Sequence, residues 1–345
     1  MATMKEIAKL AGVSRGTVDR VLNNRGSVNQ ETEKSIREIA ESLNYSPNIA
    51  GKNLAVRKKK LKFGFILFGT VDSNFFFTDV VSGIKDRAAA LSDFGVTVEI
   101  RESKVYDPEQ QVKSIDELVG LGINGLAITP INHPVVVEKL KKLSELGIPV
   151  VTSNSDIPDC GRLAYVGSNY YKNGETAAGL MNLITGGTAK IGIISGSPLV
   201  LCHLERVSGF TDYIEKHFPN LKVVNNTVNN DDDEESFIVT SSMLSKNPEI
   251  DALYLTAAGV GGACRAVSEM GLAGKLSIVS FDATAQTCRL LRDGVIDVTI
   301  AQQPKKQGAM PLDILLNYLG MGILPEKELN YTEIEIKIKE SLEDI

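Results

Sequence analysis

The sequence predicts an α/β protein with two parallel sheets, preceded by a small all-α unit. Three observations lead to this prediction. The chain has 345 residues, more than one hydrophobic core usually serves. Apolar side chains recur at helical spacing in the first sixty residues, whereas short apolar runs alternate with amphipathic stretches from Leu61 onward. A composition of 43% hydrophobic and 23% charged residues is typical of a folded chain.

The first helix is predicted by a capping box formed by Thr3 and Glu6. Its apolar stripe follows at helical spacing: Met4, Ile7, Ala8 and Ala11. Gly12 ends this helix, because glycine readily takes the left-handed conformation of a helix terminus.

Ser14 is a candidate N-cap for a second helix, and a third helix is expected from Asn29 or Gln30 to Leu43. The second helix has an apolar face made by Val18, Val21 and Leu22. Two short helices joined by a tight glycine turn, with a third behind them, describe a helix-turn-helix.

Charge is divided unevenly along the chain. Residues 1–62 carry 13 Lys and Arg against 6 Asp and Glu, whereas the remainder carries 24 against 37. A basic head on an acidic body predicts that only the head meets a polyanion. A solvated helix bundle with chance charge is the alternative that composition leaves open.

The run Met4–Asn23 resembles the N-terminal motif of the LacI/GalR family of bacterial repressors, and Leu43–Asn48 is similar to the same family. The resemblance implies a DNA-binding domain over residues 1–46 and a hinge helix with a basic linker over 47–60. It also implies that the chain is a ligand-responsive transcriptional regulator, a repressor, which binds a near-palindromic operator in double-stranded DNA as a homodimer.

The resemblance implies roles for single residues. Ser14, Thr17 and Asn23 match residues that hold phosphates, while Arg15, Gly16 and Arg20 match residues that face bases. Arginine suits guanine, because its fork donates two hydrogen bonds to one base edge. Gly16 has no side chain with which to read a base.

Asp19 stands where the family commonly has a small hydroxyl residue, and Leu54 matches a leucine that wedges into the minor groove. We expect Asp19 to pair with Arg15 rather than to accept from cytosine. The full set of candidate DNA-binding residues is Thr3, Ser14, Arg15, Gly16, Thr17, Asp19, Arg20, Asn23, Asn48, Gly51 and Leu54.

Eight buried strands are predicted in the body of the chain. They are Phe63–Phe68, Val96–Ile100, Gly125–Thr129, Pro149–Thr152, Ile191–Ile194, Ala252–Leu255, Ser277–Phe281 and Val298–Ala301. Helical patterns lie between them, at Val80–Leu91, Ser114–Leu121, Val135–Leu146 and Gly261–Glu269. Such alternation predicts parallel sheets with crossover helices, whose ligands bind at the carboxyl ends of the strands.

Residues 61–330 resemble the periplasmic sugar-binding-protein core that LacI/GalR repressors share, closest to its ribose-binding branch. The matching motifs are Asn74–Phe77, Ser195–Ser197 with Arg206–Phe210, Ser280–Asp282 and Ala301–Pro304. The resemblance implies a periplasmic-binding-protein-like core of two lobes over residues 61–345. We expect the N-lobe to hold 61–163 and 287–318, and the C-lobe to hold 164–286 and 319–345, with crossings near Leu163, Gln286 and Leu319.

A sugar or polyol effector is expected between the lobes. Sugar hydroxyls both donate and accept, so a pocket needs planar polar side chains, and aromatic rings stack on the C–H faces. Arg206 and Asp282 are expected to satisfy each other's charge when the cleft is empty. The candidate ligand-binding residues are Asn74, Phe76, Phe77, Asn132, His133, Asn154, Arg206, Thr256, Asp282 and Gln302.

Departures from the family leave the effector open. Leu255–Ala258 occupies the stretch where the family usually has an Asn-Asp pair, so one expected carboxylate is missing. A cyclitol, an amino sugar or a sugar phosphate remains an alternative to a free sugar. His133 is as compatible with the rim of the pocket as with a ligand contact.

A nucleotide-dependent α/β enzyme is the alternative of another class. Gly259–Cys264 resembles a dinucleotide fingerprint but has Cys264 in place of the last Gly or Ala. Walker and nucleophile-elbow motifs are absent. Asp231–Glu235 lacks the spacing of a calcium loop and is expected to be a solvated acidic loop. We therefore expect no enzyme activity.

No cofactor, metal site or disulfide is expected. The cysteines are scattered and the histidines form no metal-binding pair: Cys160, Cys202, Cys264, Cys288, His133, His203 and His217. No apolar run approaches the ~20 residues that span a bilayer. The start of the chain shows no signal peptide, so a cytoplasmic protein is expected.

Overall fold

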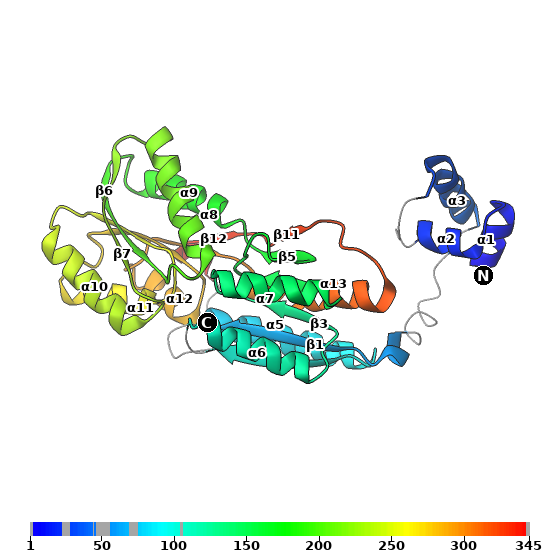
Figure 1. Cartoon of the computed structure of the whole chain (residues 1–345). Helices are drawn as coiled ribbons and strands as arrows, with labels where there is room; N and C mark the ends of the chain where they lie inside the picture. Colours follow the sequence, from blue (N-terminus) through cyan, green and yellow to red (C-terminus); the bar gives the residue numbers. More distant parts are fainter. Residues whose placement is uncertain are drawn as a thin grey trace.

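The computed structural model describes residues 3–22, 28–43, 45, 56–68, 75–103 and 106–342. In these ranges the chain forms a helical head and a two-lobed α/β core (Figure 1). The described part contains no helix that is both long enough and apolar enough to cross a membrane.

The head consists of three helices around a small core of its own. They are α1 (Met4–Leu10), α2 (Arg15–Leu22) and α3 (Gln30–Ser42). The predicted capping box is present, since Thr3 Oγ1 accepts from the backbone N–H of Glu6 at 3.3 Å and Glu6 accepts from that of Thr3 at 2.7 Å. Fully buried aliphatic side chains from all three helices meet inside, among them Ile7, Val18 and Ile36.

The first lobe is built on a parallel sheet with the order β2-β1-β3-β4-β5-β11. Its strands are β1 (Lys62–Phe68), β2 (Thr97–Ser103), β3 (Gly125–Ile128), β4 (Val150–Ser153), β5 (Ala164–Gly167) and β11 (Leu329–Tyr331). Its helices are α5 (Phe75–Ser92), α6 (Pro108–Gly120), α7 (Pro134–Glu145) and α13 (Pro304–Leu315), which continues into a π-helical segment at Leu316–Met321.

The second lobe repeats this plan with the order β7-β6-β8-β9-β10-β12, in which only β12 is antiparallel to its neighbour. Its strands are β6 (Ala189–Ser195), β7 (Leu221–Val228), β8 (Ala252–Leu255), β9 (Ser277–Phe281), β10 (Val298–Ala301) and β12 (Glu335–Lys337). Its helices are α8 (Tyr170–Ile184), α9 (Leu201–His217), α10 (Asp233–Lys246), α11 (Val260–Glu269) and α12 (Ala285–Arg292), with a short 3-10 turn at Lys339–Ser341.

The predicted fold class and all eight predicted strands are confirmed. Four strands were not predicted from the sequence: β5, β7, β11 and β12. β7 is an edge strand with mostly half-buried or exposed residues, and β11 and β12 have three residues each, so these three strands show no clear apolar run. β5 is buried but has only four residues.

The expected lobe boundaries need correction. β5 pairs with β4 in the first sheet, so the chain crosses after β5 rather than at Leu163. β10 pairs with β9 in the second sheet and β11 with β5 in the first, so the other crossings fall between β10 and α13 and between β11 and β12. Both sheets contain four-residue buried strands, such as β4 and β8, so only the hydrogen-bonded register shows which sheet each strand joins.

Helices α8 and α9 pack very closely, which positions the side chains that α9 sends into the cleft. Gly174 in α8 faces the backbone of α9, where an added Cβ would collide with the carbonyl of Arg206. Gly179, on the same helix, has no atom within 4 Å of the position that a Cβ would take. Gly174 is therefore buried against the neighbouring helix, whereas Gly179 is half-buried with open space around its Cβ position.

We expect Gly174→Ala to destabilise the protein by about 1–3 kcal/mol, because the added methyl group must push α8 away from α9. Gly179→Ala, the matched control, should stabilise by about 0.5–1 kcal/mol, because alanine has the higher helix propensity. Urea unfolding of both variants measures the difference. Equal effects of the two substitutions would contradict the close packing.

Candidate functional site

A cleft of about 360 Å³, counted to its open mouth, lies where the carboxyl ends of strands from both lobes meet. This is the edge of parallel sheets at which ligands bind. The cleft is lined by Phe68, Phe76, Phe77, Tyr106, Asn154, Val200, Cys202, His203, Arg206, Asp231, Ala257, Ala258, Asp282 and Gln302.

Aromatic rings form the first-lobe wall. Phe76 and Phe77, both in the first turn of α5, pack edge-to-face with ring centroids 5.3 Å apart. Phe68, at the end of β1, packs edge-to-face on Phe77 and on Tyr106 at 5.8 and 4.8 Å. The two predicted phenylalanines thus line the cleft, and Phe68 adds a ring that the sequence pattern did not single out.

Arg206 of α9 brings a buried guanidinium group to the opposite wall, with a side chain that is 2% exposed. Its Nη1 donates to the carbonyl of Thr256 at 2.5 Å, and its guanidinium lies 3.8 Å from the ring centroid of Phe281. Its Nε has no hydrogen-bond partner in the described residues. The arrangement combines a cation–π contact with a donor that is free for a ligand.

Asp282 follows β9 in a left-handed conformation, with a φ of 66°, which turns its carboxylate into the cleft. Gln302 Nε2 donates to Asp282 Oδ1 at 2.8 Å. The expected ion pair between Arg206 and Asp282 is not formed in the described structure, because Arg206 stacks on Phe281 while Gln302 binds the carboxylate. Burial raises the pKa of Asp282, and Arg206 and Gln302 offset only part of that rise.

Asn154 and Gln302 complete the predicted residues that reach the cleft. Asn154 follows β4, and its Nδ2 donates to Tyr170 Oη at 3.1 Å and to Gln307 Oε1 at 3.2 Å. The side-chain oxygen of Gln302 is buried without a partner among the described residues. An acceptor of this kind is available to a ligand hydroxyl.

Three predicted ligand residues do not line the cleft. His133 caps α7, accepting the backbone N–H of Val135 at 3.4 Å. Asn132 lies beside it, and its backbone N–H donates to the carbonyl of Leu199. Thr256 is buried and acts through its carbonyl, which accepts from Arg206. Asn74 lies outside the described residues.

Asp231 was expected in a solvated acidic loop, and this expectation was wrong. Asn230 and Asp231 both have positive φ, 48° and 63°, and this turn directs the Asp231 carboxylate inward, where the residue is 5% exposed. The neighbouring acidic residues face other partners, since Asp232 caps α10 and Glu234 pairs with Arg265 at 2.9 Å. One member of this acidic run faces inward. The composition of the run gives no information about backbone angles, so the sequence did not predict this orientation.

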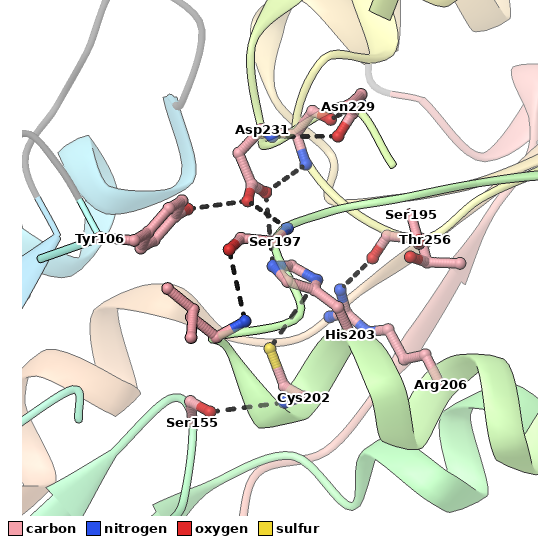
Figure 2. Close-up of polar contacts among 12 residues, drawn as sticks. Tyr106, Ser155, Ser195, Ser197, Cys202, His203, Arg206, Asn229, Asp231 and Thr256 are labelled. Atoms are coloured by element: carbon pink, nitrogen blue, oxygen red, sulfur yellow. Dashed lines mark hydrogen bonds and ion pairs between the residues drawn. The ribbon is translucent and has the colours of Figure 1, made fainter. Parts of the chain in front are cut away.

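The Asp231 carboxylate is the centre of a polar cluster that also contains Tyr106, His203 and Cys202 (Figure 2). Asp231 Oδ1 lies 3.3 Å from His203 Nε2, and Cys202 Sγ lies 3.9 Å from His203 Nδ1. The backbone N–H of Ala258 donates to the same carboxylate at 3.3 Å. Asp231 therefore supplies a carboxylate beside the stretch at which the sequence lacks the expected one.

The imidazole of His203 is held as a cation. Burial lowers its pKa, but Cys202 and Asp231 outweigh burial and raise the pKa of His203 from 6.5 to about 10. Burial likewise raises the pKa of Asp231, but His203, Tyr106 and the N–H of Ser197 lower it to about 2. The two residues form a buried ion pair at neutral pH.

The head presents the candidate DNA-binding residues of α2 on its surface. Arg15, Gly16 and Arg20 are exposed, and Arg20 Nε donates to the carbonyl of Gly16 at 3.3 Å. Ser14 Oγ accepts from the N–H of Thr17 at 3.1 Å, so Ser14 caps this helix. Burial and the Asp19 carboxylate raise the pKa of the Tyr45 phenol, and the Arg15 guanidinium offsets part of that rise. The candidates outside the described residues are Asn23, Asn48, Gly51 and Leu54.

Two family models match the chain. The model described as bacterial regulatory proteins, lacI family, matches residues 3–48, and that of the periplasmic binding protein domain matches residues 63–322. The chain is similar to the probable HTH-type transcriptional repressor ExuR of Bacillus subtilis, with 33% identity over 224 residues. The match covers 64% of this chain and 62% of that repressor, less than two thirds of its length.

Another relative and a solved structure cover more of the chain. The ribose operon repressor of Halalkalibacterium halodurans is 28% identical over 286 residues, 82% of this chain and 80% of the relative. An ABC transporter solute binding protein of Burkholderia graminis in complex with D-arabinose is 25% identical, with a TM-score of 0.75. That likeness covers 81% of this chain and 96% of the solute binding protein.

We expect His203→Gln to destabilise the protein by about 3–5 kcal/mol near pH 6, because Asp231 then keeps a buried charge without its cation. The pKa of His203 is raised on folding, so the contribution of this residue is complete below pH 6.5 and is lost as the pH rises towards about 10. Urea unfolding should therefore show the difference between wild type and variant shrinking over that range. His217→Gln, an exposed position at the end of the same helix, is the control. A pH-independent difference would argue against the ion pair.

Proposed function

The chain belongs to the lacI family of bacterial regulatory proteins and carries a periplasmic binding protein domain, and we propose that it is a transcriptional repressor whose operator affinity is set by a sugar or polyol in the cleft. The observation that carries the proposal is the cleft itself. Aromatic rings form one of its walls. The Asp282 carboxylate lines the cleft with them, as do Arg206 and Gln302, each of which has one buried polar atom without a partner among the described residues. This combination suits a ligand with apolar C–H faces and many hydroxyl groups.

The charges of the cleft favour an uncharged ligand. Two cations, Arg206 and His203, and two carboxylates, Asp231 and Asp282, line it. A sugar phosphate would add negative charge to a balanced set, whereas a sugar or cyclitol leaves it balanced. The names of the ribose operon repressor and of the D-arabinose complex also support a sugar, while cyclitols, amino sugars and sugar phosphates remain in the test panel.

The proposed mechanism couples two sites through the two lobes. An effector that contacts both walls of the cleft favours the closed arrangement of the lobes. Operator DNA, bound by the head, also favours one arrangement of the lobes. Each ligand therefore changes the affinity of the protein for the other. We propose that two copies of the chain bind the two halves of a near-palindromic operator.

We propose that the protein is no enzyme, lacks a cofactor and works in the cytoplasm. The glycine-rich segment at Gly259–Cys264 has a packing explanation instead of a nucleotide-binding one. A Cβ on Gly262 would collide with the carbonyl of Asp233, and the N–H of Gly262 donates to the Asp233 side chain at 3.0 Å. The glycine thus allows α11 to approach α10 closely.

Arg20→Ala should weaken binding to an operator selected from random DNA by about 1–3 kcal/mol, because an exposed arginine of α2 is positioned to read a base edge. Binding to non-specific DNA should change little. Lys34→Ala, at an exposed position of α3, is the control for loss of a positive charge. Fluorescence anisotropy at several salt concentrations measures both affinities. An equal loss on specific and non-specific DNA would assign Arg20 to phosphates.

Saturation with its effector should stabilise the protein by about 2.7 kcal/mol at 100 times the dissociation constant. A thermal-shift screen of pentoses, hexoses, cyclitols, amino sugars and sugar phosphates tests this expectation. Asp282→Ala should abolish the shift, because Asp282 carries a carboxylate at the cleft surface. Asp212→Ala, at an exposed carboxylate of α9, should retain it. A panel without any hit would refute a sugar or polyol effector.

A further inference from the structure

The hydrogen bond between Tyr106 and Asp231 joins the two lobes across the cleft. Tyr106 follows β2 in the first lobe, and Asp231 follows β7 in the second. Tyr106 Oη donates to Asp231 Oδ2 at 2.7 Å, as Figure 2 shows. This bond forms only when the strand ends of the two lobes lie close together.

The protein itself fills the acceptor positions of Asp231. Oδ1 accepts from His203 Nε2 and from the N–H of Ala258, both at 3.3 Å, and Oδ2 accepts from Tyr106 and from the N–H of Ser197 at 3.2 Å. A carboxylate offers about four acceptor positions. Asp231 thus has little capacity left for an effector hydroxyl, and it serves the contact between the lobes instead.

Tyr106 is held in the orientation that this bond requires. Its ring packs edge-to-face on Phe68, with centroids 4.8 Å apart. Burial, together with Asp231, raises the pKa of its phenol well above 10, so the O–H group keeps the proton that it donates. Because the acceptor is charged, the bond belongs to the stronger class of protein hydrogen bonds.

Other hydrogen bonds that cross between the lobes have neutral partners, among them the bond from Asn154 to Tyr170. The backbone N–H of Asn132 donates to the carbonyl of Leu199 at 2.8 Å, and the N–H of Cys202 donates to Ser155 Oγ at 3.4 Å. Neither involves a charged group. The bond from Tyr106 to Asp231 is therefore the charge-assisted member of this set.

We infer that Tyr106 and Asp231 are positioning residues that hold the lobes closed before any effector binds. The binding-competent arrangement of the cleft is then already populated when the effector binds. Because less free energy is needed to close the lobes, the apparent affinity for the effector is higher. The effect on the effector rests on the proposed function, whereas closure in its absence is a property of the chain alone.

Closure can be measured without a ligand. Spin labels on Lys142→Cys in α7 and Lys246→Cys in α10, in a full-length Cys288→Ser protein, report the distance between the lobes. We expect the ligand-free protein to show a predominant short-distance population. Tyr106→Phe removes one O–H group and should lower the closed-to-open ratio about tenfold or more, equivalent to at least about 1.4 kcal/mol.

Tyr171→Phe is the matched control, because Tyr171 Oη donates to Asp212 Oδ2 at 2.8 Å within the second lobe. It should leave the distance distribution unchanged. Asp231→Asn, a second variant, should shift the population in the same direction as Tyr106→Phe, and circular dichroism checks that each variant is folded. Identical distributions for wild type and Tyr106→Phe, or a ligand-free protein that is predominantly open, would overturn the inference. A failed effector screen leaves these measurements unaffected.

Discussion

A carboxylate keeps its charge away from water only when the protein supplies hydrogen-bond donors, and the cleft is organised around this requirement at Asp231. Its donors come from distant parts of the chain: Tyr106, Ser197, His203 and Ala258. Each lies just beyond a strand or at the start of a helix that follows one. The parallel order of both sheets brings these strand ends together and so satisfies the buried charge.

The core and the head treat their charged side chains differently. The core buries its cations in aromatic and carboxylate surroundings, where Arg206 stacks on Phe281 and His203 pairs with Asp231. The head leaves Arg15 and Arg20 exposed over a small aliphatic core. Buried charges suit a small ligand that replaces water, and exposed charges suit a polyanion whose counterions are released. Helix packing also positions a buried cation of the core, because the close approach of α8 to α9 sets the position of Arg206.

Much of the cleft could be predicted from short motifs. Phe76, Phe77, Asn154, Arg206, Asp282 and Gln302 all line it. The predictions failed where the direction of the side chain decided the contact. His133 caps a helix, Asn132 donates through its backbone N–H, and Thr256 accepts through its carbonyl. A motif identifies a position along the chain, but the orientation of the side chain depends on the backbone angles and on the partners that fold against it. Asp231 was missed for the same reason, because the left-handed turn that buries it has no compositional signal.

By itself the sequence determined the helix-turn-helix head, its basic charge, the strand and helix alternation of the core and the family to which the chain belongs. Periodicity and motif spacing are local properties of the chain, so they can be recognised without knowledge of the fold. The tertiary structure decided which sheet each short strand joins, where the chain crosses between the lobes and which charged groups meet in the cleft. These depend on hydrogen-bonded register and on contacts between residues more than one hundred positions apart, such as Tyr106 and Asp231, which no local pattern encodes.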